Sequence, residues 1–150
     1  SLALDGRGHV YVADRENARV QVFSTRGDFE QVWTSRILAE ADRSSWGKHV
    51  SSVRYDKVLD LLVVTEGSGV SVRTRGGCTV ADGLTGLEWP HAAVLLSLNQ
   101  TRATGGFVPS KTTGRPMGFT ILVAELEGRR VREFRTQEAR MRSRASSMYG

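Results

Sequence analysis

Few residues of this chain have the type and spacing that enzyme chemistry or metal binding requires. Cys78 is the only cysteine, so it can form neither an internal disulfide nor a CxxC pair for zinc, and we expect it to be a partly buried strand residue. The three histidines, at positions 9, 49 and 91, stand far apart, each at the expected start of a strand. A catalytic zinc site needs three protein ligands and an open position. Local sequence therefore supplies no complete metal-binding motif.

The densest run of charged and polar side chains is Asp14-Arg15-Glu16-Asn17, which falls between two expected strands. Arg15 has two interpretations. It is either a substrate-binding residue or a turn residue that pairs with a neighbouring acid, and surface pairs of that kind contribute only ~0–1 kcal/mol. We expect Asp14 to accept hydrogen bonds from backbone N–H groups of the turn.

The elements that must position these residues are short strands separated by Gly, Asp and Asn turns. Four strands in about 40 residues, joined by tight turns, are typical of one blade of a β-propeller. The expected strands span residues 1–4, 9–13, 19–23 and 29–33, then 49–55, 58–65, 70–73 and 78–80, and finally 91–98, 119–126 and 131–135. Turns are expected at Asp5-Gly6, Gly76-Gly77 and Asp82-Gly83. The sequence predicts an all-β fold, a partial β-propeller of about two and a half to three four-stranded blades.

An internal repeat supports this prediction. Residues 10–14 and 19–23 are echoed by residues 121–125 and 130–134. In both places an apolar strand ends in Ala plus an acid, and the next strand begins with Arg-Val and ends in Phe. Trp33, Trp46 and Trp89 are expected to pack between blades rather than line a pocket.

The remaining segments lack strand periodicity. Residues 37–42 are interpreted as a connection between blades, and residues 99–117 as a long inserted loop that is functional or disordered. We predict a propeller domain over residues 1–135 and a basic, disordered tail over residues 136–150. No aromatic side chain interleaves with the arginines of that tail before Tyr149, so nucleic acid is not an expected partner. No apolar run approaches the ~18 residues of a membrane span.

The chain starts directly in a strand pattern, and we expect it to be a piece of a longer polypeptide. An open set of blades leaves sheet faces and edges uncovered. We therefore expect the chain to be marginally stable alone, to self-associate, or to join the remaining propeller blades.

Residues 4–27 resemble the NHL-repeat pattern, through Leu4-Asp5, residues 8–17, residues 19–23 and Gly27. Within that class, three features resemble the C-terminal blades of peptidyl-α-hydroxyglycine α-amidating lyase. They are the run at residues 12–17 with Arg19 and Gln21, then Trp46-Gly47-Lys48 with Val50 and Tyr55, and then Pro90-His91. In patches, the resemblance covers roughly residues 1–135.

The resemblance implies a six-bladed propeller that holds zinc on its axis through three histidines and cleaves a peptide with a C-terminal α-hydroxyglycine into a peptide amide and glyoxylate. Zinc suits this reaction because a metal polarises and deprotonates the carbinolamide hydroxyl. Arg15 would be a catalytic residue near the substrate carboxylate, which a guanidinium holds at two points, and His91 a zinc ligand. The lyase also implies a secretory or extracellular location.

This sequence departs from the family at several positions. Ala92 stands where the family has Asp, so the calcium of the full-length family is not expected here. The chain begins just after the Pro-His that would supply a second ligand, and the third histidine lies in earlier blades. We therefore expect a lyase fragment that is inactive alone. The alternatives are a non-enzymatic NHL module that binds protein or RNA, with His91 a locally bonded residue at a strand start, and a truncated product without activity.

Overall fold

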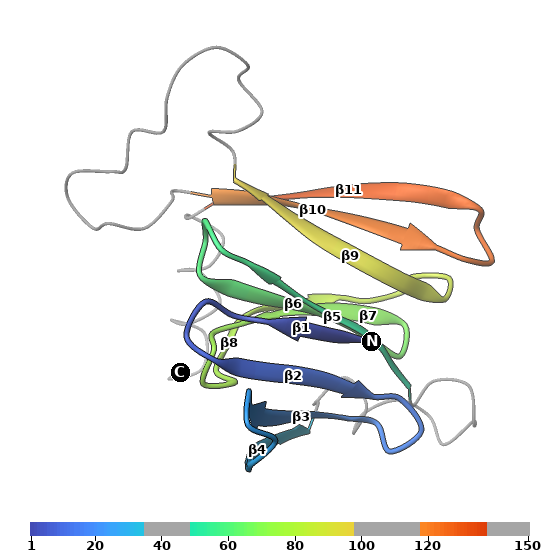
Figure 1. Cartoon of the computed structure of the whole chain (residues 1–150). Coiled ribbons are helices and arrows are strands. Elements are labelled where there is room, and N and C mark those ends of the chain that lie inside the picture. Colours follow the sequence, from blue (N-terminus) through green and yellow to red (C-terminus); the bar gives the residue numbers. More distant parts are fainter. Residues whose placement is uncertain (35–48, 98–117, 138–150) are drawn as a thin grey trace, which may run out of the picture.

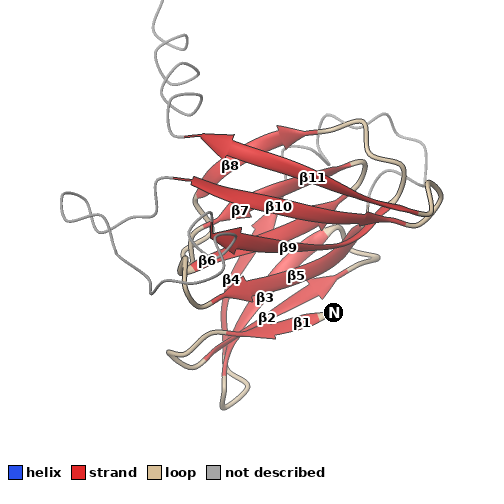
Figure 2. Ribbon diagram, turned by 90° about the horizontal axis from the view of Figure 1, so that it is seen from above, coloured by secondary structure: helices blue, strands red, loops and turns tan. Residues whose placement is uncertain are grey.

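The computed structural model of the chain describes residues 1–34, 49–97 and 118–137, and within them it contains strands and turns only (Figure 2). The strands form three antiparallel sheets, each made of strands consecutive in sequence. The first sheet contains β1 (Leu2–Leu4), β2 (His9–Asp14), β3 (Arg19–Ser24) and β4 (Phe29–Thr34). The second contains β5 (Val50–Asp56), β6 (Leu61–Glu66), β7 (Gly69–Arg73) and β8 (Thr79–Leu84). The third contains β9 (Pro90–Ser97), β10 (Gly118–Glu125) and β11 (Arg130–Gln137).

The three sheets stack on one another in chain order, which is the arrangement of propeller blades (Figure 1). Their first strands lie side by side, since β1 packs on β5 and β5 packs on β9. Two four-stranded blades and one three-stranded blade confirm the predicted all-β, partial-propeller fold.

Side-chain alternation explains why the sheets stack. In β2, Tyr11 and Ala13 are buried, whereas Val10 and Val12, on the other face, are only half-buried. Because successive side chains of a strand point to opposite faces, each sheet presents two surfaces that can be covered.

Two apolar cores lie between the blades. Between the first and second sheets, the buried residues are Tyr11, Ala13, Val20, Val22, Trp33, Val50, Val53, Leu62 and Val64. Between the second and third sheets, they are Leu59, Val63, Val70, Val72, Leu87, Ala93, Leu95, Phe119, Ile121 and Val123. Trp33 therefore packs between blades as expected, against residues of the second sheet such as Val50 and Val53.

The apolar run 58–65 was wrongly predicted as one strand. Residues 57–60 form a turn instead, and β6 starts at Leu61. A carboxylate oxygen of Asp56 accepts hydrogen bonds from the backbone N–H groups of Val58 (2.9 Å) and Leu59 (2.8 Å), and Asp60 has a φ of 54°. This side chain closes the turn locally, which an apolar periodicity cannot reveal.

Two smaller predictions also fail. Asp82-Gly83 is not a turn but lies within β8, at a register shift between the pairs Val72–Ala81 and Val70–Leu84. Cys78 is exposed in the turn before β8 rather than partly buried in a strand. Trp46, the connection at 37–42 and the loop at 99–117 lie outside the described residues, as does the tail apart from Thr136 and Gln137, with which β11 ends.

A turn of the second blade packs closely on the first blade, and this contact can be tested at Gly77. Its φ is +84°, and a Cβ there would lie 2.5 Å from Nε1 of the buried Trp33. Gly27 has a similar φ of +94° and no atom within 4 Å of the same position. Both Gly→Ala changes strain the backbone by about 1–2 kcal/mol, but only Gly77→Ala also overpacks a core, by roughly 1–3 kcal/mol. Urea denaturation should show the larger loss for Gly77→Ala, and equal losses would contradict this packing.

Candidate functional site

Each blade has an acid at the end of its second strand: Asp14, Glu66 and Glu125. Backbone hydrogen bonds at this end join the second strand to the start of the first strand within the first and second blades, and join the second blade to the segment that leads into the third. Ala13 N–H donates to Ser1 O (2.8 Å), Gly67 N–H to His49 O (2.8 Å) and Leu87 N–H to Ser68 O (2.9 Å). In Figure 1 the N-terminus and the arrowheads of β2 and β10 accordingly lie on the same side. We call this side, where β1, β5 and β9 begin, the acid end.

The three acids bind side chains of the following strand in one pattern. Asp14 Oδ2 accepts from Arg19 Nε (2.7 Å) and Gln21 Nε2 (2.8 Å). Glu66 binds Ser71 and Arg73, the latter through Nη2 at 3.4 Å. Glu125 accepts from Arg130 Nε (2.6 Å) and lies 3.5 Å from Arg132 Nη1. In every case the donors lie on the same face of the third strand as the acid, so the three sheets repeat one unit.

These contacts lower the pKa of two of the three acids, Asp14 and Glu125. Hydrogen bonds, first from Arg19 and next from Asn17, hold the pKa of Asp14 below its usual value. Arg130 does the same for Glu125, whose burial opposes the shift. Asp14 was predicted to bind backbone N–H groups, and that prediction is wrong, because its partners are the side chains of Asn17, Arg19 and Gln21.

Arg15 follows directly after Asp14, in the turn between β2 and β3 at the acid end. Its side chain is 51% exposed, and Nε lies 3.8 Å from Glu16 Oε1. The expected pairing with a neighbouring acid is thus observed for Glu16. This long, exposed contact contributes little, so the guanidinium can be directed toward an anionic ligand.

His91 is the exposed second residue of β9, next to a register shift at the Ala124–Glu125 step of the partner strand. It lies at the acid end, on a different blade from Arg15. His49 precedes β5 at the same end, and its Nδ1 is buried without a hydrogen-bond partner within the described part of the chain. Among residues 1–34, 49–97 and 118–137, no group of three or more His, Cys, Asp or Glu side chains could hold a metal ion.

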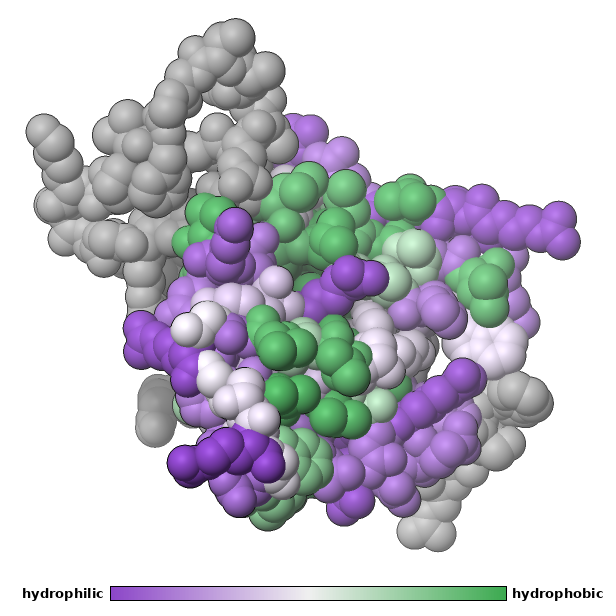
Figure 3. Space-filling view, in the orientation of Figure 1, coloured by the Kyte–Doolittle hydropathy of each residue, from purple (hydrophilic) through white to green (hydrophobic). Residues whose placement is uncertain are grey.

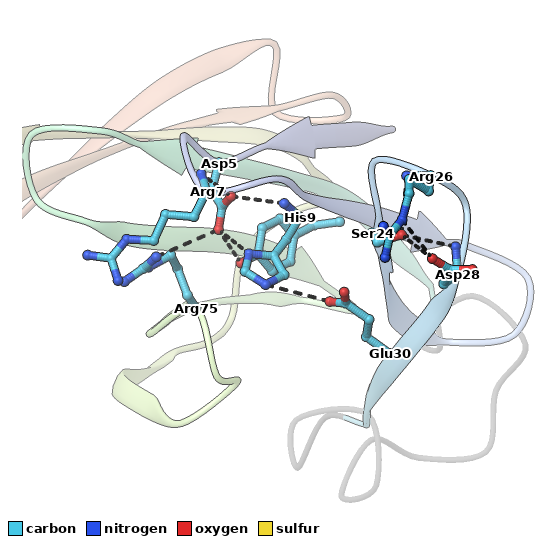
Figure 4. Close-up of polar contacts among 9 residues, drawn as sticks. Asp5, Arg7, His9, Ser24, Arg26, Asp28, Glu30 and Arg75 are labelled. Carbon is cyan, nitrogen blue, oxygen red and sulfur yellow. Dashed lines mark hydrogen bonds and ion pairs between the residues drawn. The ribbon is translucent and has the colours of Figure 1, made fainter.

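A second polar cluster lies at the opposite end of the first blade, where sequence reasoning found only a turn (Figure 4). The side chain of Asp5 is fully buried. Its Oδ1 accepts from the backbone N–H groups of Arg7 (2.8 Å) and His9 (3.0 Å). Its Oδ2 accepts from the Tyr11 hydroxyl (3.0 Å) and lies 2.8 Å from His9 Nδ1 and 4.0 Å from Arg75 Nη1.

This cluster ties the turn of the first blade to the second blade. Burial alone would raise the pKa of Asp5, but the hydrogen bonds from His9, Arg7 and Tyr11 outweigh it and lower the pKa to about 2. Burial and the bond to Asp5 raise the pKa of Tyr11. Arg75, which also pairs with Asp60 at 2.9 Å, comes from the turn between β7 and β8. The sequence feature that could have indicated this cluster is the spacing of Asp5 and Tyr11, which lie six residues apart and form a hydrogen bond.

Comparison with known protein families finds a match that lies in the first blade. The NHL repeat family model matches residues 1–23, which cover β1, β2 and all but the last residue of β3. Residues 1–23 form an NHL-type repeat. No curated protein matches the chain in a sequence comparison. The same pattern of acid and side-chain donors recurs in the second and third blades. Within the described residues, no helix is long and apolar enough to cross a membrane.

The buried Asp5 of the NHL repeat predicts a pH dependence of stability. Its folded pKa of about 2 lies below the ordinary value of 3.8, so its contribution is complete above about pH 4 and is lost as the pH falls toward 2. The difference corresponds to about 2 kcal/mol. Urea denaturation between pH 2 and 6 should show a weaker pH dependence for Asp5→Asn than for the wild type. Asp28→Asn, at an exposed acid of the next turn, should follow the wild type, and an unchanged slope in Asp5→Asn would contradict the assignment.

Proposed function

We propose that this chain is part of a zinc-dependent peptidyl-α-hydroxyglycine α-amidating lyase, with its site at the acid end of the blades. One observation carries the proposal. Arg15 and His91, which the sequence resemblance assigns to substrate and metal, come from different blades but lie at the same end of the stack. That end is where the first strands of all three blades begin.

The local geometry fits a role for Arg15 in holding a carboxylate. Arg19 and Gln21 already bind Asp14, so the fixed acid does not engage the guanidinium of Arg15. A guanidinium presents a planar fork that matches a carboxylate at two points. The C-terminal carboxylate of the substrate is therefore the group that we propose for Arg15.

The described residues do not make a complete zinc site, because they supply no cluster of three ligands. His91 is the single ligand that we propose from this chain. A lone histidine cannot form a catalytic zinc site, so we expect no glyoxylate release from the chain alone. Binding, rather than turnover, is the appropriate readout.

Peptide binding tests the role of Arg15. A fluorescent peptide ending in α-hydroxyglycine should bind the full chain more tightly than the same peptide ending in an amide. Arg15→Ala should weaken binding of the first peptide by about tenfold, because a charge-assisted hydrogen bond contributes roughly 1.5–3 kcal/mol. Arg26→Ala is the matched control, since Arg26 is an exposed turn arginine beside Asp28. Equal affinity for both peptides would contradict the lyase and favour a non-enzymatic module that binds protein or RNA.

Zinc titration of the purified chain tests the role of His91. Because one histidine holds zinc only weakly, we expect added zinc to bind the chain with low affinity and His91→Ala to weaken that binding. His9→Gln is the control, because His9 begins β2 and therefore lies at the end opposite to His91. Equal zinc affinity of the wild type and His91→Ala would contradict the assignment of His91.

A further inference from the structure

Consecutive blades meet twice through the same pair of sheet faces. We call the face of each sheet that carries Asp14, Glu66 or Glu125 its acid face, and the other its back face. The acid face of the second sheet packs on the back face of the first, and the acid face of the third packs on the back face of the second. The acid face of the first sheet and the back face of the third have no covering sheet within the described residues.

The acid face of the first sheet has the composition of an interface. In each blade a valine lies two residues before the acid. Val64 and Val123, in the second and third blades, are fully buried, and Val12 is the equivalent residue of the first blade. In the first blade the neighbours of Val12 and Val10 on β1 are Leu2 and Leu4. These leucines are 63% and 56% exposed.

The apolar surface continues across this sheet toward its outer strands. Phe23 on β3 packs edge-on against Phe29 on β4, with ring centroids 5.8 Å apart. Phe29 is 59% exposed and Val32 43% exposed. Figure 3 shows apolar side chains gathered over β1 and β2.

The back face of the third sheet is the complementary half. Val94 is 39% exposed and Val131 67% exposed. Val94 pairs with Leu122 across β9 and β10, and Ala124 pairs with Val131 across β10 and β11. In the first and second sheets, the positions of this face are occupied by buried residues such as Tyr11 and Val63.

We propose that the back face of the third sheet of one copy of this chain packs on the acid face of the first sheet of a second copy. Every copy carries both halves of an interface that the chain already forms twice internally, so the contact needs no new kind of packing. Such a head-to-tail contact is heterologous, since different surfaces meet. Contiguous exposed apolar surface of this kind marks an interaction site on a soluble protein. This inference does not depend on the lyase activity.

The first test is the mass of the full chain at micromolar concentration, measured by light scattering after size exclusion. We expect at least twice the 16.5 kDa of one chain. Leu4→Arg, on the acid face of the first sheet, and Val94→Arg, on the back face of the third, should each lower that mass. Val58→Arg is the matched control, because Val58 has the same 39% exposure as Val94 but lies in the turn between β5 and β6.

Mixing the two variants distinguishes this contact from any symmetric one. The Leu4→Arg chain keeps an intact third sheet, and the Val94→Arg chain keeps an intact first sheet. An equimolar mixture should therefore form a pair with twice the mass of one chain, whereas each variant alone should not. Circular dichroism should confirm that both variants keep their β-structure.

Three results would overturn the proposal. The first is a folded wild-type chain that is monomeric at micromolar concentration. The second is an association that Val94→Arg leaves intact, which would indicate that two first sheets face each other. The third is a mixture of the two variants that stays at the mass of one chain.

Discussion

Covering an apolar sheet face with the next sheet is the interaction on which the rest of this structure depends. Both cores lie between blades, and each draws its residues from two consecutive sheets. A sheet alone would leave Leu62 and Val64 on one face, and Val63 on the other, in water. Because the side-chain period of a strand is two, a slip of one residue would exchange these faces. The stack therefore fixes the register of every strand that it covers.

The same constraint explains how the repeated acids differ. Glu66 and Glu125 lie on covered faces, and their side chains are 1% and 0% exposed, whereas Asp14, on a face that no described sheet covers, is 19% exposed. A buried carboxylate must be hydrogen-bonded or paired, because burial without a partner is costly. Each acid has such partners on the following strand. The same contact between an acid and the following strand thus joins the second and third strands in all three blades. The acid is more deeply buried where the next sheet covers its face.

Stacking also assembles the candidate site. Arg15 and His91 are separated by 76 positions in the sequence, yet both lie where first strands begin and second strands end. The opposite end holds a second set of contacts, in which Asp5 binds its own turn and receives Arg75 from the second blade. The acid end and the opposite end of the blades therefore differ in structure. One presents exposed polar side chains, and the other joins neighbouring blades through a buried carboxylate.

The sequence by itself determined the all-β fold, the positions of most strands and the NHL character of residues 1–23, because strand alternation and Gly or Asp turns are local properties. It failed at residues 58–60, where one carboxylate closes a turn within an apolar run. Only the tertiary structure decided which apolar faces are covered, that Asp5 is buried and that Arg75 approaches it. These depend on contacts between blades, and neither the spacing nor the type of a residue in one strand specifies what a neighbouring sheet places beside it.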